Sequence, residues 1–247
     1  EHRMMLQTGL DFVAQRIIPN LERIEAQEEG LTPKLLEEVG ELGLLGSSVP
    51  EDLGGLGLDF KSTMLITESM GGAHSFAVSF SAHTGIATLP ILYYGNDAQK
   101  QKYVPGLATG ELKGCYCLTE PGSGSDANSG KTTAKLNEAG THYVLNGQKM
   151  WITNGGFADV LIVFAKIDDD DVPHRGVALD NGWPDWPDLQ ATSRLAVQVS
   201  KKFIEAHISA PKNVNWNEPS CLQHIYVNEI EVSRFNTKKH LENYQGD

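Results

Sequence analysis

Residues 116–126 read YCLTEPGSGSD and are the most informative stretch of the sequence. Tyr116 to Leu118 predict a strand, and the residues after them predict a loop crowded with hydroxyl groups and exposed backbone N–H groups. Gly122 and Gly124 would let the loop approach a ligand closely, and successive N–H groups in such a turn can form an anion-binding nest. A plain polar turn is the alternative. The stretch lacks the strand–Gly-x-Gly-x-x-Gly–helix context of a dinucleotide-binding motif.

A second informative stretch covers residues 146–156 and reads NGQKMWITNGG. Trp151 and Thr153 are two positions apart, so on one strand they would point to the same face. Trp151 would then offer a ring for stacking and Thr153 a hydroxyl beside it, a pair suited to a flat heteroaromatic ligand. The alternative is a core tryptophan beside a threonine on a pleated surface.

Strand-like runs alternate with turn residues around these two stretches, over residues 113–170. The runs are Cys115–Leu118, Lys131–Leu136, His142–Leu145, Lys149–Thr153 and Val160–Ala165. Asn146-Gly147 lies near the centre of residues 142–153 and predicts a β-hairpin there. We therefore expect an antiparallel β-barrel or sandwich domain over 113–170, which could extend further along the chain.

Residues 1–112 predict an all-α bundle. Leu6 to Ile18 form an apolar stripe of helical period, and Phe76–Leu92 is a largely apolar helical run that belongs in a core or an interface. The predicted N-caps are Thr32 (with Pro33 at the first helical position), Asp59 (of a helix through Met70) and Asp97 (of a short helix closed by Pro105-Gly106). The fold class is therefore α+β, with a helical domain before the β domain.

The sequence changes character again at the acidic run Asp168–Asp171, and residues 171–247 form a tail of unclear fold. Within the tail, Leu189–Ile208 fits an amphipathic helix or a strand almost equally well. His224–Phe235 alternates in the manner of a strand. We leave 171–247 unassigned as a domain.

Composition excludes several classes of protein. Lys plus Arg number 20 against 32 for Asp plus Glu, a net charge of −12, which argues against a general nucleic-acid binder. Three cysteines cannot form a disulfide framework and favour a reducing compartment. Cys115 and Cys117 lack the spacing of common zinc hairpins, so we expect no metal site. We expect no membrane span, and because the chain begins at Glu1, a leader could have been removed.

Taken together and in this order, the two stretches resemble the acyl-CoA dehydrogenase family, over roughly residues 1–170. Val49-Pro50-Glu51 with the glycine-rich loop after it, and Gly95 to Pro105, also match. Ala82-His83 and Asn154–Lys166 most resemble the branch that handles longer acyl chains. The family chain normally continues for well over a hundred residues more, and the tail does not resemble that part.

The resemblance implies a flavoprotein oxidoreductase of fatty acid β-oxidation that uses FAD to oxidise a fatty acyl-CoA to the trans-2-enoyl-CoA. A glutamate base removes the α-proton while the β-hydride passes to flavin N5, and the electrons go to an electron-transferring flavoprotein. The resemblance also implies a homo-oligomer, a tetramer in the family. Its expected location is the cytoplasm of a bacterium or the mitochondrial matrix of a eukaryote.

The same resemblance implies which residues bind the cofactor. Tyr116, Leu118 and Thr119 are expected to line the flavin near its pyrimidine edge. Ser125 is expected to touch the acyl-CoA or the neighbourhood of the flavin phosphate. In the second stretch, Trp151 is expected to pack against the flavin from the side away from the substrate, and Thr153 to hydrogen-bond near N5. Ile152, between them, completes the set.

The catalytic base has no match in the sequence and stays unassigned. Glu205, Glu218, Glu229 and Glu231 of the tail are interpreted as surface charges, and Glu120 is expected to hold its loop rather than abstract a proton. Cys221 and His224 have a C-x-x-H spacing, but two ligands are too few for a metal.

Two alternatives to the dehydrogenase stay open. One is a non-catalytic fragment that binds flavin, acyl-CoA or a protein partner, which the unmatched tail favours. The other is an acyl-CoA oxidase, which passes the electrons to oxygen.

Overall fold

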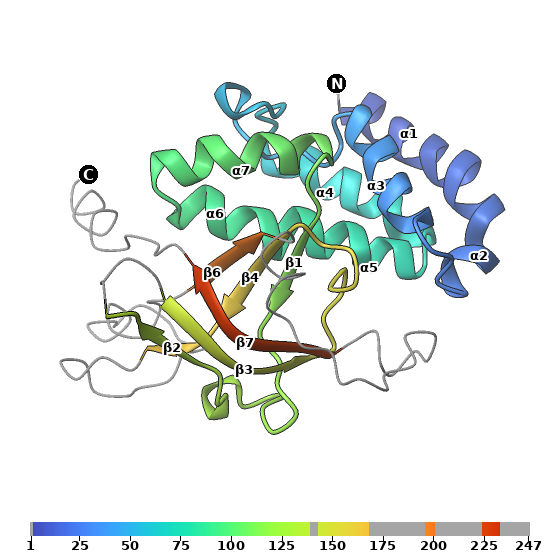
Figure 1. Ribbon diagram of the computed structural model, residues 1–247. Helices are drawn as coiled ribbons and strands as arrows, with labels where there is room; N and C mark the ends of the chain where they lie inside the picture. Colours follow the sequence, from blue (N-terminus) through green and yellow to red (C-terminus); the bar gives the residue numbers. More distant parts are fainter. Residues whose placement is uncertain (1, 139–142, 168–195, 201–223, 233–247) are drawn as a thin grey trace. The chain divides into compact units, whose positions relative to one another are not determined.

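The computed structural model describes residues 2–138, 143–167, 196–200 and 224–232. The chain divides into two compact units, Glu1–Gly114 and Cys115–Asp247. The first is built from helices and the second from strands (Figure 1), which confirms the predicted α+β class. The predicted domain boundaries near residues 112 and 170 stay predictions.

The helical unit contains α1 (His2–Phe12), α2 (Leu21–Glu25), α3 (Leu31–Glu41), α4 (Phe60–Ser69), α5 (Ser75–Ser81), α6 (Thr88–Tyr94) and α7 (Asp97–Thr109). The apolar stripe predicted up to Ile18 is helical, but it changes from α1 to a π-helical turn at Val13–Ile17. Buried apolar side chains from α1, α3, α4, α5 and α7, among them Phe12, Leu36, Ile66 and Phe76, form its core.

The helix starts test the predicted caps. Asp59 is confirmed, because its side chain accepts the N–H of Ser62 at 2.9 Å. The N-cap predicted at Thr32 is wrong. Gly30, in the left-handed region at φ 76°, is the N-cap, so α3 already begins at Leu31. The N-cap predicted at Asp97 is also wrong, because the residue before it, Asn96, caps α7 through a reciprocal capping box with Gln99.

Two further expectations for the helices need correction. Helix α7 runs through Pro105 to Thr109 and ends at Gly110, whose φ of 79° suits a C-terminal glycine. The apolar run over Phe76–Leu92 is helical throughout, as predicted, and passes from α5 to α6 through a π-helical turn at Ala82–Ala87. Only one face of it is core, since Val78 and Ile86 are exposed.

The run Ser75–Tyr94 also bears on the expected absence of a membrane span. Among the described residues it is the one helical stretch that is long and apolar enough to cross a bilayer. Length and composition alone are a weak indication, because core helices of globular proteins pass the same test. Phe76, Phe80 and Ile91 within it are buried in the helical unit.

His83, in the π-helical turn, is a fully buried polar residue whose ring bonds to two other segments of the chain. Its Nε2 lies 2.8 Å from the carbonyl oxygen of Leu107 near the end of α7, and its Nδ1 accepts the N–H of Gly114 at 3.1 Å. Only a neutral ring protonated at Nε2 satisfies both bonds. Burial lowers the pKa of His83 to about 4, outweighing the bond to Leu107, and nearby Lys113 adds to the shift.

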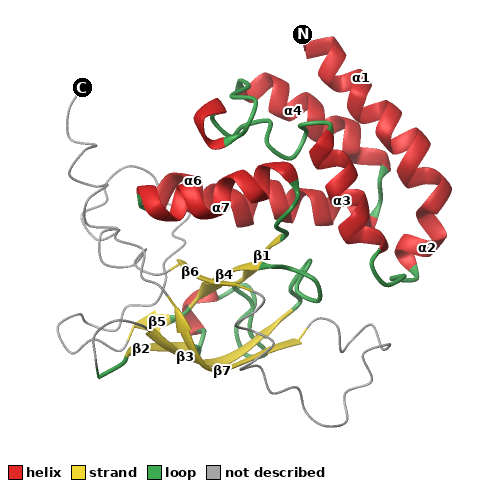
Figure 2. Ribbon diagram, turned by 45° about the horizontal axis from the view of Figure 1, so that its top comes forward, coloured by secondary structure: helices red, strands yellow, loops and turns green. Residues whose placement is uncertain are grey.

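Two sheets form the β unit (Figure 2). One sheet has the order β1 (Gly114–Cys117), β4 (Val160–Phe164), β6 (Ala196–Ser200), and the other has the order β5 (Lys166–Ile167), β2 (Thr133–Leu136), β3 (Tyr143–Met150), β7 (His224–Val232). The β2–β3, β3–β7 and β4–β6 pairs are antiparallel, whereas β2 and β5 are parallel.

The two sheets share one core but do not close on each other. Buried side chains from both of them form a single cluster, which includes Cys115, Cys117, Leu145, Leu161 and Val163. Within the described residues both sheets are open, so the sandwich form of the prediction fits and the barrel is wrong. The chain crosses from one sheet to the other at Ala165, between β4 and β5.

Two strands come from the tail. Residues 196–200 are a strand rather than a helix, which resolves the ambiguity over Leu189–Ile208 for that part. The strand predicted over His224–Phe235 is confirmed at His224–Val232. Strand β6 pairs with β4 and strand β7 with β3, so each sheet contains one strand from the tail.

The predicted hairpin at Asn146-Gly147 is wrong. Strand β3 runs without interruption from Tyr143 to Met150, with a register shift against β7 between Leu145 and Asn146. A type I′ hairpin turn needs positive φ at both central residues, and neither Asn146 nor Gly147 has it. Gly147 is instead a close-approach glycine, because a Cβ there would lie 2.3 Å from Thr132 Oγ1.

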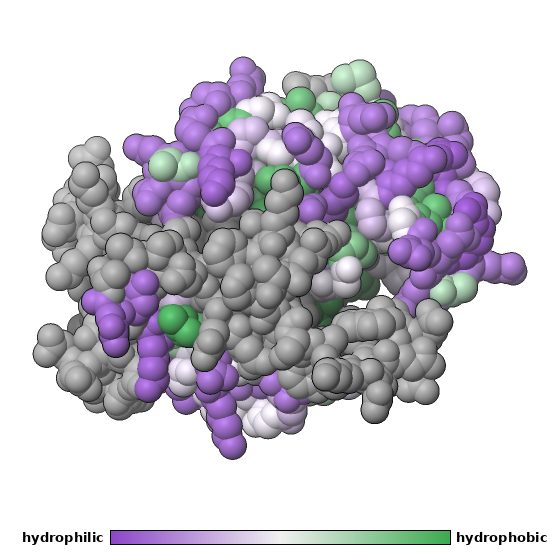
Figure 3. Space-filling model, viewed as in Figure 1, coloured by the Kyte–Doolittle hydropathy of each residue, from purple (hydrophilic) through white to green (hydrophobic). Residues whose placement is uncertain are grey.

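The surface reflects the excess of acidic and other polar residues. On the face shown in Figure 3, hydrophilic side chains predominate over the described part of the helical unit, and apolar residues appear as small separate patches. Such a hydrophilic face agrees with the large number of charged residues in the sequence.

Candidate functional site

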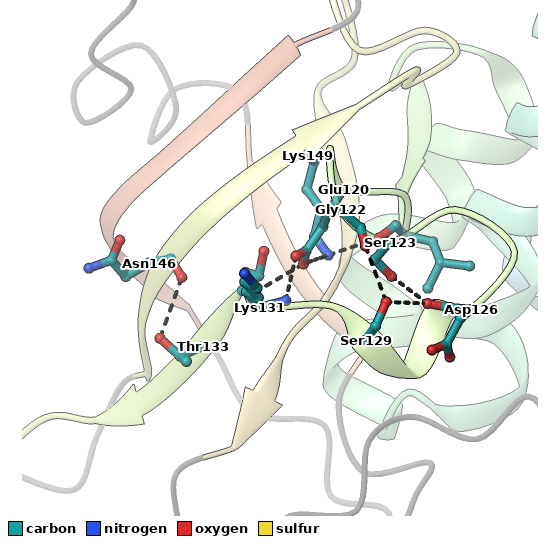
Figure 4. A network of polar contacts seen from close by, with 11 residues as sticks. Glu120, Gly122, Ser123, Asp126, Ser129, Lys131, Thr133, Asn146 and Lys149 are labelled. Atoms are coloured by element: carbon teal, nitrogen blue, oxygen red, sulfur yellow. Dashed lines mark hydrogen bonds and ion pairs between the residues drawn. The ribbon is translucent and has the colours of Figure 1, made fainter.

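The loop after β1 folds back on itself in a tight turn. Glu120 and Ser123 exchange two main-chain hydrogen bonds, each of 3.0 Å. The hydroxyls of Ser123 and Ser129 both donate to the carbonyl oxygen of Asp126, at 2.7 and 2.8 Å (Figure 4). The serines therefore fix the course of the loop, whereas Gly122 and Gly124 face open space, with no atom within 4 Å of an added Cβ.

Glu120 holds this loop from the inside, as expected from the sequence. Its side chain is 7% exposed and accepts the N–H of Thr132 at 3.0 Å and that of Lys131. It also forms an ion pair with Lys149, whose Nζ lies 2.7 Å from Glu120 Oε1. Burial opposes ionisation of Glu120, but the hydrogen bonds from Lys149, Thr132 and Lys131 outweigh it and lower the pKa of the carboxyl.

Lys149 is a buried charged residue of the candidate site that sequence reasoning missed. It is 2% exposed on β3, and its Nζ donates to the carbonyl oxygen of Leu118 at 2.9 Å as well as to Glu120. Burial lowers the pKa of Lys149, although the pairing with Glu120 opposes the shift. Its position in the sequence could have indicated burial. Tyr143 and Leu145 are buried, and Lys149 is an even number of residues away from them on β3, so its side chain points to the same face of the strand. A lysine on an inward face needs a buried partner.

The two stretches singled out in the sequence meet at this point. The N–H of Met150 donates to the carbonyl oxygen of Thr119 at 2.9 Å, next to the contact between Lys149 and Leu118. The end of β3 is thus bonded to the start of the loop at residues 118–126. Leu118 and Thr119 are brought beside the residues that precede Trp151.

Trp151 does not lie on a strand, which corrects the pairing proposed for Trp151 and Thr153. Strand β3 ends at Met150, and Trp151 adopts a φ of 59°, a strained conformation for a bulky residue. Its side chain is 57% exposed. Ile152 is buried in the sheet core, and Thr153 is half-buried in the following turn. Backbone strain of this kind gathers at functional sites, which supports a binding role for Trp151.

The remaining predicted site residues lie around the same loop. Tyr116 on β1 is half-buried and packs against Phe164, with the ring centroids 4.7 Å apart, and burial raises the pKa of Tyr116. Ser125 is exposed in the loop after β1. The assignment of these side chains to a cofactor stays a prediction.

A small cavity lies behind the loop, between the two sheets. It has a volume of about 20 Å³ and is lined by Leu118, Glu120, Ala127, Gly130, Thr132, Lys149, Phe164, Ala165 and Lys166. Thr132 Oγ1 is buried without a hydrogen-bond partner among the described residues. A space of this size holds about one water molecule. The cavity is therefore too small for a flat heteroaromatic ligand.

The candidate residues of the tail are not tested. Glu205, Glu218 and Cys221 lie outside the described residues. Glu229, Glu231 and His224 belong to β7, of which only the backbone course is described. Among the described side chains, no group of three or more His, Cys, Asp or Glu could hold a metal ion.

Comparison with known proteins gives two matching domain models. Residues 1–111 match the acyl-CoA dehydrogenase N-terminal domain, and residues 115–182 match the acyl-CoA dehydrogenase middle domain. A probable acyl-CoA dehydrogenase of Bacillus subtilis (strain 168) is 55% identical over 170 residues, which are 69% of this chain and 29% of that protein. The mitochondrial very long-chain specific acyl-CoA dehydrogenase of Macaca fascicularis is 47% identical over 133 residues, 53% of this chain and 20% of that protein.

A solved structure agrees with these relatives. The acyl-CoA dehydrogenase from Bacillus anthracis, crystallised as a complex with FAD, superimposes with a TM-score of 0.78 at 44% identity. The alignment covers 96% of this chain and 37% of that one. The chain thus spans 20–37% of the length of these three proteins.

Proposed function

Because this chain belongs to the acyl-CoA dehydrogenase family, we propose that it binds FAD and an acyl-CoA and serves in the oxidation of the thioester to the trans-2-enoyl-CoA. The observation that carries the proposal is the junction of the two loops, where Met150 bonds to Thr119 and Lys149 to Leu118. This junction presents Thr119 and Trp151 from neighbouring segments, as one flat ligand would require.

The residues present fit a flavin. Gly122 and Gly124 leave the outer side of the loop open, and Trp151 exposes an aromatic face. Stacking on such a ring and hydrogen bonds from loop N–H and hydroxyl groups are the contacts that a planar heterocycle with polar edges needs. When bound, FAD would take up the hydride from the β-carbon of the acyl chain.

The roles of the chain's own residues follow from this arrangement. Leu118, Thr119 and Tyr116 would line the ring, and Thr153 would place its hydroxyl beside it. Trp151 would shield the ring from solvent on the side away from the substrate. Ser125, exposed on the outer loop, would contact the acyl-CoA or the phosphate neighbourhood of the cofactor.

The catalytic glutamate stays unassigned. Within the described residues of the site, Glu120 is the buried carboxylate, and its bonds to Lys149, Thr132 and Lys131 occupy it. It therefore stabilises the loop and is not offered as the base. The electron acceptor is proposed to be an electron-transferring flavoprotein, and the active form a homo-oligomer.

Anaerobic titration tests the proposal. The purified protein is loaded with FAD, and palmitoyl-CoA or butyryl-CoA is added under argon. Bleaching of the flavin absorbance supports a dehydrogenase, and a faster reaction with palmitoyl-CoA supports the long-chain branch suggested by Ala82-His83. Bound flavin that no acyl-CoA bleaches would instead support a non-catalytic binding fragment. Rapid reoxidation by oxygen after bleaching would favour an acyl-CoA oxidase.

A further inference from the structure

The hydrogen bond from Lys149 to Leu118 places a cation against a peptide group of the candidate site. The carbonyl of Leu118 and the N–H of Thr119 belong to the same peptide group, and Lys149 Nζ donates to that carbonyl at 2.9 Å. Resonance couples the two ends of a peptide group. A cation on the oxygen therefore draws electron density from the nitrogen and makes its N–H a stronger donor.

The surroundings make this polarisation strong. Lys149 is 2% exposed and Glu120, its counter-ion, 7% exposed, so water screens the charge little. The N–H of Thr119 makes no main-chain hydrogen bond within the described parts of the chain, whereas its carbonyl accepts from Met150. The donor end of the polarised peptide is therefore available to a ligand.

We infer that Lys149 is a positioning and tuning residue of the proposed flavin site, acting through the Leu118–Thr119 peptide rather than by touching the ligand. The inference rests on the proposed function, which places Thr119 against the ring. A strengthened N–H donor stabilises the more electron-rich reduced ring more than the oxidised one. Lys149 would thus raise both the affinity for FAD and its midpoint potential.

The test compares four variants that separate the effect of the Lys149 charge from the effect of its side-chain shape. Lys149→Met removes the ammonium, Lys149→Gln keeps a donor without charge, and Lys149→Arg keeps the charge. Lys131→Met is the matched control, because Lys131 has an exposed side chain and contacts Glu120 only through its backbone N–H. The FAD dissociation constant and the midpoint potential of the bound flavin are measured for each.

We expect at most about tenfold weaker FAD binding in Lys149→Met, because the bond from the Thr119 N–H to the ring is weakened but kept, and tenfold is near the upper limit for losing one neutral hydrogen bond. Its midpoint potential should become more negative. Lys149→Gln should share the shift in potential, while Lys149→Arg and Lys131→Met should stay near the unmodified protein. Equal potentials in Lys149→Gln and Lys131→Met would overturn the inference and leave the proposed function intact.

A measurement on the flavin-free protein distinguishes failure of the proposed function from failure of the inferred peptide polarisation. The amide proton of Thr119 is observed by NMR in the flavin-free protein, and loss of the cation in Lys149→Gln should move its resonance upfield, whereas Lys131→Met should not. This upfield shift in a protein that binds no FAD would reject the proposed function but keep the polarised peptide. If the resonance is unmoved, the polarisation is rejected. If Lys149→Met fails to fold, the Gln and Arg variants carry the comparison.

Discussion

The N–H of Met150 lies 2.9 Å from the carbonyl oxygen of Thr119, and this bond ties the end of β3 to the loop after β1. The two residues are far apart in the sequence, yet each belongs to one of the two stretches that resemble the family. The bond, together with the burial of Lys149 and Glu120 beside it, explains how two separate loops act as one candidate site. The predictions below probe this junction and its supports.

Glu120 is expected to make the folding stability of the protein depend on pH. Because its folded pKa is lowered from the ordinary value of 4.5, the carboxylate stabilises the protein above that pH, and the contribution is lost as the pH falls through the folded pKa. Glu120→Gln should cost roughly 3 kcal/mol at neutral pH, since it leaves Lys149 without a counter-ion. Urea unfolding between neutral pH and about pH 3 measures both effects. The exposed Glu138→Gln is the control, and an equal pH slope in Glu120→Gln and the unmodified protein would contradict the prediction.

His83 should cause a second loss of stability at a higher pH. Its folded pKa of about 4 lies below the ordinary 6.5, so the unfolded chain binds the proton first and stability falls as the pH drops from about 6.5 towards 4. The total loss should be on the order of 3 kcal/mol. In His83→Gln this part of the pH dependence should vanish, as measured by chemical denaturation. The exposed His74→Gln should retain it, and its disappearance there would show that His83 is not the source.

Gly147 should tolerate no side chain. An added Cβ would lie 2.3 Å from Thr132 Oγ1 and 2.6 Å from Thr132 Cα, so β2 and β3 would have to move apart. Gly147→Ala should therefore destabilise the protein by about 1–3 kcal/mol, measured as a shift in the thermal or urea midpoint. Gly156→Ala, where no atom lies within 4 Å, is the control. Equal stability of the two variants would show that β2 and β3 are not so closely packed at Gly147.

Trp151 should matter for the cofactor and little for folding. Its side chain is 57% exposed, so Trp151→Ala should change the melting temperature only slightly. Loss of stacking on the indole should weaken FAD retention by on the order of 1 kcal/mol. Flavin content after extensive dialysis measures the effect, with the exposed Tyr94→Ala as the control. Unchanged flavin content would remove Trp151 from the proposed site.

Thr153 should act on flavin reduction. Thr153→Val keeps the shape of a half-buried side chain and deletes one hydroxyl, at a cost to stability of about 1 kcal/mol or less. The rate of anaerobic flavin reduction by acyl-CoA should fall more than the stability does. Stopped-flow absorbance beside a melting curve separates the two effects. Identical reduction rates in the two proteins would argue that this hydroxyl is not beside the ring.

Local patterns predicted much of the fold because they act over a few residues. Apolar periodicity indicated helices before residue 112 and strands after it, and Asp59 was identified as a cap from its place before an apolar run. The failure of the predicted hairpin has a long-range cause. Asn146-Gly147 has the composition of a hairpin turn, but β3 is paired on both sides, by β2 and β7, and these ladders keep the strand extended. A pairing partner distant in the sequence overrides a local turn preference.

The order of the residues was enough to predict the family, the α+β class and the two stretches that contain the candidate site, because these features depend on local composition and spacing. The three-dimensional contacts were needed to show that Lys149 is buried against Leu118 and Glu120 and that Trp151 lies outside the strand with a strained backbone. They also show that both sheets are open over the described strands. The physical reason is that burial and ion pairing depend on segments meeting across the fold. The spacing of residues along one strand cannot show what lies opposite them.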